Sequence, residues 1–248
     1  MKEDLETAYL FVHGIQGSPA QFSFLTERLP EDIRVRNLLL PGHGADVKAF
    51  RRTGREQWLG AVRQAAEELR GQCGRLIFVG HSMGCLLGLE VERERPGTFA
   101  GMVLLCCPFC IRPTARYARN SLRASRPERE ADDDAVRAAR EANSVTAAHP
   151  TQYLTCVYPY LELLRLMRTV RKDGETPACP VRFLFSEKDE IVSPRSAYFA
   201  RERFTAEPEI LPGCGHNWFS AEGKERIYTT VKVLIQPDQI NTRRRSPL

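Results

Sequence analysis

Residues 76–84 read Leu-Ile-Phe-Val-Gly-His-Ser-Met-Gly, and the run Cys85–Glu90 that follows is mostly apolar. The apolar residues before Gly80 predict a buried strand, and the run after Gly84 predicts a helix. A serine at such a tight strand-to-helix turn is forced into strained backbone angles that lift its hydroxyl clear of the sheet. The unpaired N–H groups at the start of the helix favour negative charge beside Ser82. We therefore predict that Ser82 is a nucleophile.

The spacing of the two glycines around Ser82 is informative only because of its context. Glycine and serine each make up roughly 7 % of residues, so Gly-x-Ser-x-Gly arises by chance in about one chain in ten of this length. The turn is tight, and side chains at Gly80 and Gly84 would collide with neighbouring backbone. The prediction therefore depends on the flanking strand and helix and on partners elsewhere in the chain.

The composition is that of a soluble globular protein, with 42 % hydrophobic and 27 % charged residues among 248. This length suits one large domain, or one domain with an insertion. No apolar run approaches the ~20 residues that span a bilayer, so we expect no stable membrane insertion. Residues 1–6 are acidic and lead directly into a strand-like run, unlike a signal peptide, which favours a cytoplasmic location.

The formal net charge of +5 is mild and is concentrated in two places. One is the arginine-rich segment 112–129, which is followed by acidic residues, and the other is Arg243–Arg245. Neither stretch has regularly interleaved aromatic residues, so we interpret both as solvated surface and expect no nucleic-acid partner.

The eight cysteines are scattered through apolar segments, which predicts reduced and mostly buried thiols. Cys107-Pro108-Phe109-Cys110 is a Cys-x-x-Cys motif, but it follows a late strand of a large domain rather than an early strand of a small one. A redox or metal role for Cys107 and Cys110 is the alternative to packing. Zinc would need a second ligand pair at suitable spacing, and none stands out, so we predict no metal site.

Short strand-like runs alternate with amphipathic helical runs, which predicts an α/β fold with a parallel sheet covered by helices on both faces. A capping box of Ser18 and Gln21, with Pro19 in the first turn, predicts an early helix start. Another start is predicted at Ser193-Pro194. The expected strands are 8–12, 33–40, 76–79, 102–106, 181–185 and 209–211, and the expected longer helices are 55–70 and 221–234.

The alternation stops between about Pro108 and Pro177. Residues 112–143 are polar and helix-prone, whereas 153–171 are apolar and aromatic. We therefore predict about six parallel strands in a core of residues 1–107 and 176–248, with a frayed tail from 237, and an inserted helical cap at 108–175. An insertion after the strand ending near Cys106 lies over the carboxyl ends of the strands, where ligands bind in open α/β sheets, so it is a candidate lid.

A serine hydroxyl is a weak nucleophile at neutral pH and needs a base, which histidine supplies when a carboxylate orients it. In the order Ser, acid, His, two histidines lie downstream of Ser82. His149 falls inside the insertion, whereas His216 follows the last expected strand at the edge where Ser82 lies, so we predict His216 as the base. Asp189, in the loop after the preceding strand, is the predicted acid. Glu187 and Glu190 are its alternatives and are expected to face water.

Two N–H donors must hold the oxyanion of a tetrahedral intermediate. One is expected from Met83, the residue after the nucleophile. The other is expected from the loop after the first strand, His13-Gly14-Ile15-Gln16-Gly17, with the Ile15 N–H favoured and the Gln16 N–H as the alternative. His13 is expected to order this loop. His43 and His81 are likewise expected to be structural.

Taken together, Val12-His13-Gly14, Pro41-Gly42-His43-Gly44, Gly80–Gly84, Ser186–Val192 and Gly215-His216 resemble the α/β-hydrolase superfamily, most closely its small bacterial carboxylesterases and monoacylglycerol lipases. The resemblance covers about residues 6–107 and 178–236. It implies a serine hydrolase that cleaves short- to medium-chain esters or monoacylglycerols through an acyl-enzyme on Ser82.

Other readings remain open. The Gly-His-Ser-Met-Gly motif is also similar to the elbow of type II thioesterases, and some members of the fold bind ligands without turning them over. Relatives that use an aspartate nucleophile are disfavoured by Ser82. The chemistry requires no metal and no organic cofactor, and the expected partner is a small-molecule ester.

The apolar part of the insertion is the expected shelter for the acyl chain, unless it only packs the lid onto the core. The predicted substrate contacts are Gln16, Phe109, Tyr153, Tyr160, Leu164 and Met167. Acyl-chain length, the alcohol and the oligomeric state do not follow from the sequence.

Overall fold

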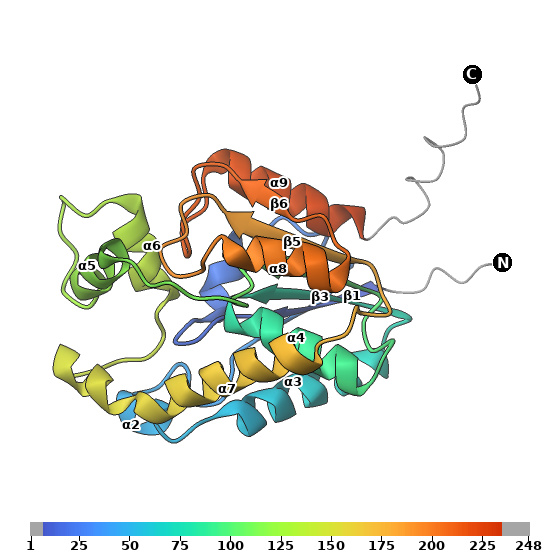
Figure 1. Ribbon diagram of the computed structural model, residues 1–248, viewed down its shortest axis with the longest axis horizontal. Coiled ribbons are helices and arrows are strands. Elements are labelled where there is room, and N and C mark those ends of the chain that lie inside the picture. Colours follow the sequence, from blue (N-terminus) through green and yellow to red (C-terminus); the bar gives the residue numbers. More distant parts are fainter. Residues whose placement is uncertain (1–6, 235–248) are drawn as a thin grey trace.

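The computed structural model describes residues 7–234, and within them the chain forms one six-stranded parallel sheet flanked by helices (Figure 1). The strand order is β2-β1-β3-β4-β5-β6. The predicted α/β-hydrolase architecture with six parallel strands is confirmed. The strands are β1 (Thr7–Val12), β2 (Arg34–Leu38), β3 (Arg75–His81), β4 (Gly101–Leu105), β5 (Val181–Ser186) and β6 (Glu209–Leu211).

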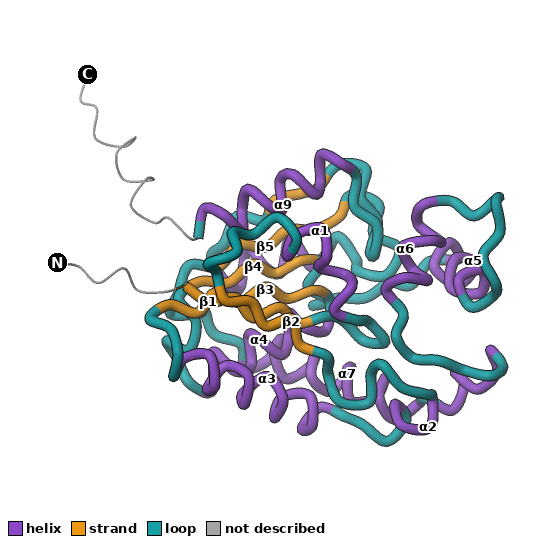
Figure 2. The backbone as a smooth tube through the Cα atoms, turned by 180° about the vertical axis from the view of Figure 1, so that it is seen from behind, coloured by secondary structure: helices purple, strands orange, loops and turns teal. Residues whose placement is uncertain are grey.

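Helices cover both faces of this sheet. The short helix α1 (Ser23–Thr26) packs with α9 (Ala221–Val233) on one face, and α3 (Arg55–Arg70), α4 (Met83–Glu94) and α7 (Val157–Asp173) lie together on the other (Figure 2). The helix α8 (Arg195–Phe204) packs on β5. The remaining helical elements are η1 (Pro19–Phe22), α2 (Val47–Phe50), α5 (Ala115–Ala124), α6 (Asp134–Ala142) and η2 (Pro150–Thr155).

Burial follows position in the sheet. β1, β3 and β4 are interior strands and are almost wholly buried, as expected for parallel strands with helices on both faces. β2 is an edge strand and is largely exposed, and at Arg34–Leu38 it is shorter than the predicted strand 33–40. The most buried part of the sheet, around β1, β3 and β4, therefore leads into the turn that carries Ser82.

The helix α3 has the bounds that its apolar period predicts. Trp58, Val62, Ala65, Ala66 and Leu69 are all buried on one face. The Gln57 side chain accepts a hydrogen bond from the Gly54 N–H at 2.7 Å at the start of the helix. The Trp58 Nε1–H donates to the Pro41 carbonyl at 3.2 Å, which ties this helix to the loop after β2.

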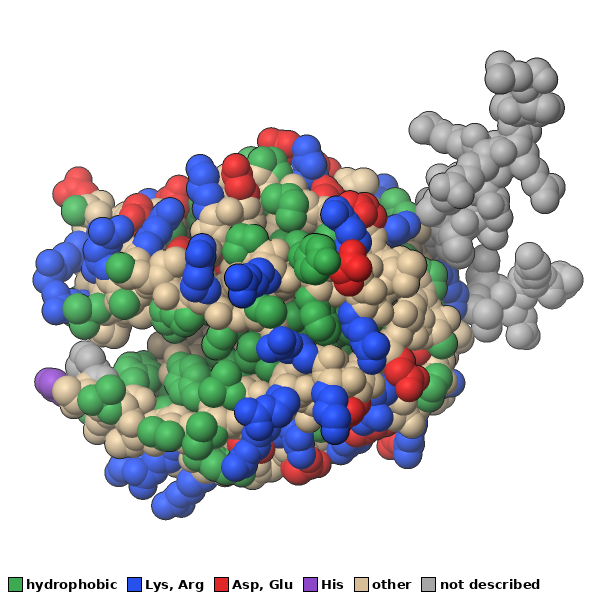
Figure 3. Space-filling model, viewed as in Figure 1, with side chains coloured by type: hydrophobic (Ala, Val, Ile, Leu, Met, Phe, Trp, Pro, Cys, Tyr) green, Lys and Arg blue, Asp and Glu red, His purple; other side chains and the backbone are tan. Residues whose placement is uncertain are grey.

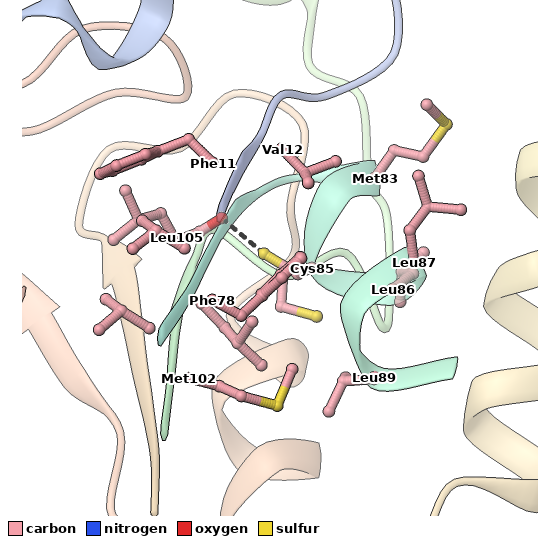
Figure 4. Packing of buried hydrophobic residues seen from close by; sticks show 14 of the residues in the cluster. Phe11, Val12, Phe78, Met83, Cys85, Leu86, Leu87, Leu89, Met102 and Leu105 are labelled. Atoms are coloured by element: carbon pink, nitrogen blue, oxygen red, sulfur yellow. Dashed lines mark hydrogen bonds between the residues drawn. The ribbon is translucent and has the colours of Figure 1, made fainter. Parts of the chain in front are cut away.

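The helix α4 packs against β1 and β3, and Figure 4 shows Cys85 on the side of this helix that faces the strands. The Cys85 thiol donates to the Leu105 carbonyl at 3.2 Å. A Cβ on Gly84 would lie 2.0 Å from the Val12 carbonyl oxygen, so only glycine allows this approach. The predicted collision with backbone at this glycine is confirmed.

The inserted segment divides into two parts. α5 and α6 pair with each other at the carboxyl end of the sheet, whereas α7 runs along α3 and α4 (Figure 1). Leu166, Met167 and Val170 of α7 belong to the same hydrophobic core as the strands. The second half of the insertion is therefore also a layer of the core, and the part that overhangs the sheet edge consists mainly of α5, α6 and η2.

One predicted helix start is wrong in its details. Ser18 makes no capping hydrogen bond, and the element that follows is a 3-10 turn. The Gln21 side chain instead points to the loop after β1, where its Oε1 accepts from the Gly14 N–H at 3.4 Å and its Nε2 donates to Asn217 Oδ1 at 3.0 Å. Tertiary partners have displaced the local cap.

Some predictions fall outside the described part of the chain. The acidic N-terminal residues 1–6, the tail from 237 and the arginines at 243–245 all do so. Between residues 7 and 234, no helix has both the length and the apolar character needed to cross a bilayer. The eight cysteines are all unpaired with one another, including Cys107 and Cys110.

Candidate active site

The candidate site lies at the carboxyl edge of the sheet, between β1 and β3. The connection after β1 leads to β2 on one side of β1, whereas β3 lies on the other side of β1. The strand order therefore reverses at this point. Crevices at such switch points are where α/β sheets bind ligands. Ser82 follows β3, Asp189 follows β5 and His216 follows β6, and the fold brings all three to this edge.

Ser82 occupies a strained turn. Its backbone angles are φ 51° and ψ −121°, a left-handed region that costs a non-glycine residue about 1–3 kcal/mol. The turn is held by hydrogen bonds from the Ser82 N–H to the Leu105 carbonyl at 2.9 Å and from the Cys85 N–H to the Ser82 carbonyl at 3.0 Å. This conformation places the Ser82 hydroxyl at the N-terminus of α4, as the strand-turn-helix pattern predicts.

A chain of hydrogen bonds joins the three side chains. The Ser82 hydroxyl donates to His216 Nε2 at 3.1 Å. His216 Nδ1 lies 2.9 Å and 3.1 Å from the two carboxylate oxygens of Asp189. Because a carboxylate only accepts, Nδ1 carries the imidazole proton and Nε2 is the free base. The arrangement can take a proton from Ser82 and hold the resulting imidazolium.

The charges of this pair are set by competing effects. Burial lowers the pKa of His216, but the facing Asp189 carboxylate and its hydrogen bond outweigh burial, and the pKa lies above its ordinary value. Burial raises the pKa of Asp189, yet the His216 charge and the hydrogen bonds from His216, Val192 and Ile191 bring it below its ordinary value. Asp189 is therefore ionised at neutral pH and ready to stabilise an imidazolium.

Met83 and Ile15 carry the two backbone N–H groups that the sequence predicts as oxyanion donors. Met83 is the first residue of α4, so its N–H has no partner within the helix. Ile15 lines the same cavity as Ser82, and its N–H makes no hydrogen bond within residues 7–234. The Gln16 N–H, the alternative donor, donates instead to His43 Nε2 at 3.0 Å. Of the two candidates in this loop, only the Ile15 N–H is free.

The three other buried histidines form hydrogen bonds with backbone groups. His13 Nε2 accepts from the Leu40 N–H at 3.1 Å, and its Nδ1 donates to the Gly14 carbonyl at 2.8 Å. Burial, with nearby His43, lowers the pKa of His13 to about 3, and burial lowers the pKa of His43 to about 4. His81 Nε2 donates to the His216 carbonyl at 2.9 Å. These neutral rings position the loop after β1 and the loop that carries His216.

Glu190 differs from its prediction. It was expected to face water, but it is only 8 % exposed and accepts a hydrogen bond from the His216 N–H at 2.8 Å. Its carboxylate also contributes to the raised pKa of His216. Glu187, by contrast, is exposed as expected and binds the Gly213 N–H at 2.7 Å. The loop after β5 folds so that the Glu190 carboxylate lies beside the backbone of His216. Residue type alone does not reveal this arrangement.

A cavity of about 500 Å³ opens above Ser82 and His216, within the size range of small-molecule sites. Figure 3 shows a hollow at the margin of the molecule where this cavity lies. The hollow is bounded by the α5–α6 part of the insertion and by the part formed by η2 and the start of α7. Most of its walls are apolar. The inserted segment contributes, among others, Ile111, Tyr117, Leu122, Ala139, Tyr153, Leu154, Tyr160 and Leu163.

The predicted substrate contacts divide into two groups. Gln16, Tyr153 and Tyr160 line the cavity, but the other three do not, and these predictions are corrected. Phe109 is fully buried in the core, with ring centroids 4.9 Å from Phe199 and 5.3 Å from Phe204. Met167 is buried in the main core, and Leu164 is 46 % exposed to solvent.

One group of side chains has the chemistry of metal ligands. Ligand atoms of His81, Cys106 and His216 lie within 4.8 Å of one another. Both His216 nitrogens are already hydrogen-bonded, and Cys106 Sγ lies 3.3 Å from Ser186 Oγ. An ion in this position would have to displace the hydrogen bonds that join His216 to Ser82 or Asp189.

Several residues of the site carried no signal in the sequence. Asn120, Asn217 and Trp218 line the cavity, and Ser144 reaches the loop after β1. The Ser144 N–H donates to the Gln16 carbonyl at 2.8 Å, and its hydroxyl binds the Gly17 carbonyl. Asn217 and Trp218 follow His216 directly, and proximity could have suggested them. Asn120 lies in polar helix-prone sequence and Ser144 lies in the loop after α6, and neither stretch carries a motif.

Ser82, Asp189 and His216 follow one another along the chain in the order typical of hydrolases of this architecture, and Ser82 lies at a strand-to-helix turn. A model described as the alpha/beta hydrolase family matches residues 9–228, so the chain belongs to the α/β-hydrolase family. A search of curated proteins found no match to this chain.

Solved structures that match this fold include hydrolases of several kinds. One from the study of the metagenome-derived lipolytic enzymes LipS and LipT is 20 % identical, with a TM-score of 0.67 and 94 % of each chain covered. A monoacylglycerol lipase from Paleococcus ferrophilus is 19 % identical, with a TM-score of 0.66 and coverage of 92 % of this chain and 93 % of its own. The N-acyl homoserine lactonase AidH is 13 % identical, with a TM-score of 0.62 and coverage of 93 % and 90 %. At these identities the likeness concerns the fold.

Proposed function

We propose that this α/β-hydrolase cleaves carboxylic esters of short- or medium-chain acids, or monoacylglycerols, through an acyl-enzyme on Ser82. The observation that carries the proposal is the hydrogen-bonded series Ser82, His216, Asp189 at the floor of an apolar cavity. The lipase and esterase structures among those with the same fold support an ester substrate.

The reaction follows from the atoms in place. Ser82 Oγ attacks the ester carbonyl carbon as its proton passes to His216 Nε2, and Asp189 stabilises the imidazolium through Nδ1–H. The Met83 and Ile15 N–H groups donate to the oxyanion. His216 Nε2 then gives its proton to the departing alcohol oxygen. Water attacks the acyl-enzyme with the same base, and Ser82 is released with the acid.

The cavity favours a carbon chain on one side of the ester. Tyr153, Tyr160 and Leu163 offer apolar surface within the same space as Ser82. Burying one methylene contributes about 0.8 kcal/mol, so each added carbon that fits should improve kcat/KM severalfold until the cavity is full.

The test is a series of p-nitrophenyl esters of increasing acyl length, assayed with the wild type and with Ser82→Ala. We expect a maximum at short or medium length in the wild type and loss of turnover in the variant. Matched oxygen and sulfur esters distinguish an esterase from a thioesterase, because a clear preference for the sulfur ester favours the latter. Turnover retained by Ser82→Ala would contradict the proposed nucleophile.

A further inference from the structure

An exposed apolar stripe runs along η2 and the first half of α7. Its members are large hydrophobic side chains that are open to solvent, namely Leu154, Val157, Leu161 and Leu164. With 3.6 residues per turn, the three members on α7 share one side of this helix, whereas Leu163, Leu166 and Met167 lie opposite and are buried. Leu154 is 78 % exposed and Val157 is 60 % exposed. A row of exposed apolar side chains of this kind marks an interaction surface.

The stripe begins at the mouth of the cavity. Leu154 belongs to the stripe and also lines the cavity above Ser82. On the other side of the hollow, Leu122 of α5 likewise lines the cavity and is 50 % exposed. Figure 3 shows hydrophobic side chains along the lower arm, beside the hollow. A hydrocarbon chain that lies along the stripe can therefore enter the cavity past Leu154 over apolar surface.

Cationic side chains border the stripe. Arg165 and Arg168 are exposed beside it on α7. The helix α2 packs against η2 and contributes three further exposed cations, Lys48, Arg51 and Arg52. Burial raises the pKa of Cys156 at the start of α7, and the charge of Arg51 opposes this effect, so Arg51 lies near the stripe. The three α2 cations form no ion pair within residues 7–234, and their charge is available to a partner.

Few carboxylates offset this positive charge. Between residues 144 and 172 the sequence has one acidic residue, Glu162, which is buried and paired with Arg165. The Asp46 carboxylate caps α2 and is engaged there. The α5–α6 part of the insertion differs, because three of its arginines are paired with the aspartates at 132–134. The surface around the stripe therefore combines apolar side chains with unneutralised cations.

We propose that the stripe and the cations of α2 and α7 form a docking surface for an anionic lipid bilayer, with the mouth of the cavity turned toward the lipid. The apolar side chains enter the interfacial region, and the cations lie at the level of the lipid phosphates. An apolar and a basic signal together give firm but reversible attachment, and no spanning helix is required. This inference goes beyond the proposed hydrolysis and does not depend on which bond is cleaved.

Two other occupants fit this surface less well. A second copy of the chain, related by twofold symmetry, would bring the same cations face to face, and like charges repel. An acidic protein would pair with the cations but would leave the apolar path from the stripe into the cavity without a use. A lipid surface matches both the charge and the path.

The test measures binding to vesicles of ether-linked phospholipids, which an esterase cannot cleave. One set is phosphatidylcholine alone, and the other is phosphatidylcholine and phosphatidylglycerol in equal parts. Co-sedimentation gives the partition coefficient of the protein. We expect the wild type to bind the anionic vesicles, and to bind them more weakly at high salt because screening reduces the attraction. Absence of binding to the anionic vesicles at low salt would overturn the proposal.

The combined variant Lys48→Gln/Arg51→Gln/Arg52→Gln removes the charge of α2. Its partition coefficient for the anionic vesicles should fall by about a hundredfold, at about fivefold for each cation. A control of equal net charge removes three exposed cations from β2, α3 and α9 through Arg36→Gln, Arg70→Gln and Lys232→Gln. The control should keep most of the binding. An equal loss in both proteins would show that net charge alone acts, and would contradict a defined docking surface.

The combined variant Val157→Ser/Leu161→Ser removes two members of the stripe that do not line the cavity. Its binding to the anionic vesicles should fall by about tenfold, because less apolar surface enters the lipid. Tyr198→Ser/Ile210→Ser, at exposed hydrophobic positions on α8 and β6, is the control and should bind as the wild type does. Unchanged binding after loss of the two stripe residues would contradict a role for the stripe.

Two further measurements separate this inference from other outcomes. Each variant should hydrolyse a soluble p-nitrophenyl ester as fast as the wild type, which shows that it folds. If no ester is cleaved even by the wild type, the proposed function fails, the melting temperature reports folding instead, and the vesicle results stand by themselves. Sedimentation velocity detects self-association. A wild-type dimer that Val157→Ser/Leu161→Ser abolishes would assign the stripe to a second copy and overturn the lipid proposal.

Discussion

The sheet edge that carries Ser82 and the cavity wall formed by α5 and α6 of the inserted segment are stabilised in different ways. At the sheet edge, the strained backbone of Ser82, the close approach of Gly84 to β1 and three neutral histidines leave little freedom. The wall depends on side-chain contacts, such as Asp132, which binds Arg123 at 3.1 Å and Arg140 at 2.7 Å between α5 and α6. We infer that the edge sets the reaction and the wall sets the substrate.

Two short stretches of backbone pairing connect these regions. At the start of the insertion, the Arg112 and Thr114 N–H groups donate to the carbonyls of Ile191 and Glu190, in the loop of Asp189, at 2.8 and 2.9 Å. After α6, Ser144 binds the loop after β1, and the Val47 N–H donates to the Thr146 carbonyl at 2.9 Å. The wall is therefore fastened to both loops of the site.

Ser82→Ala should have the largest effect of any substitution. Removing the nucleophile is expected to lower kcat by about a millionfold for every ester, because the remaining groups of such a site act as a unit with it. Burst and steady-state assays with p-nitrophenyl esters measure the loss. The melting temperature should not fall, since the side chain of Ser82 contributes little packing. A small, substrate-dependent loss would contradict the division between edge and wall.

Asp189→Asn should be the next largest. The amide keeps the shape but can donate to His216 Nδ1 and so stabilise the wrong tautomer, which is expected to cost about 10⁴-fold in kcat. The reduction should be uniform across acyl lengths. Glu187→Gln, in the same loop but exposed, is the control and should remain within about twofold. A comparable loss in both variants would identify a disturbed loop instead.

Ser144→Ala tests the connection between the two regions. The alanine removes the hydroxyl that accepts from the Gly44 N–H at 3.1 Å and binds the Gly17 carbonyl. Losing these hydrogen bonds should loosen the loop after β1, which carries the Ile15 N–H proposed to bind the oxyanion. We expect kcat to fall by about tenfold, with KM little changed. Thr155→Ala, whose hydroxyl donates to the Gln152 carbonyl within η2, should leave kcat unaffected. A change in KM alone would place Ser144 in substrate binding.

Glu190→Gln should shift the pH dependence. The base form of His216 is required, so kcat/KM rises with pH through the pKa of His216. That pKa is raised by Asp189 and also by Glu190, and removing the Glu190 charge lowers it. The acid limb of the profile should therefore move to lower pH, while the plateau falls modestly. An acid limb that stays in place or moves to higher pH would show that Glu190 does not act on His216 through its charge.

The smallest effect is expected at Leu164. It is exposed, so Leu164→Ala should change neither stability beyond about 0.5 kcal/mol nor the chain-length profile. The adjacent Leu163 lines the cavity and is buried. Leu163→Ala enlarges the cavity and should shift the preferred acyl length upward. If Leu164→Ala produced that shift, α7 would present the opposite face to the substrate.

The sequence predicts most of the core because its periodicities are strong. The strand ending at Val12 and the helix Arg55–Arg70 lie where the apolar pattern puts them, and the motif order brings Ser82, Asp189 and His216 to one edge. It fails where burial depends on partners far along the chain. The two faces of α7 are both apolar, so the pattern cannot tell Leu163 at the cavity from Leu164 in solvent or Met167 in the core.

The amino-acid sequence by itself determined the parallel α/β architecture and the side chains predicted to react, because a tight turn, buried strands and a histidine after the last strand are local features that residue type reveals. The tertiary structure alone decided which N–H in the loop after β1 is free, where Gln21 and Glu190 turn, and which residues enclose the cavity. Each of these depends on a hydrogen-bond partner or a packed surface supplied by a distant segment. Asn120 is the clearest case, since only the folded chain shows that its amide nitrogen is buried and that no residue between 7 and 234 pairs with it.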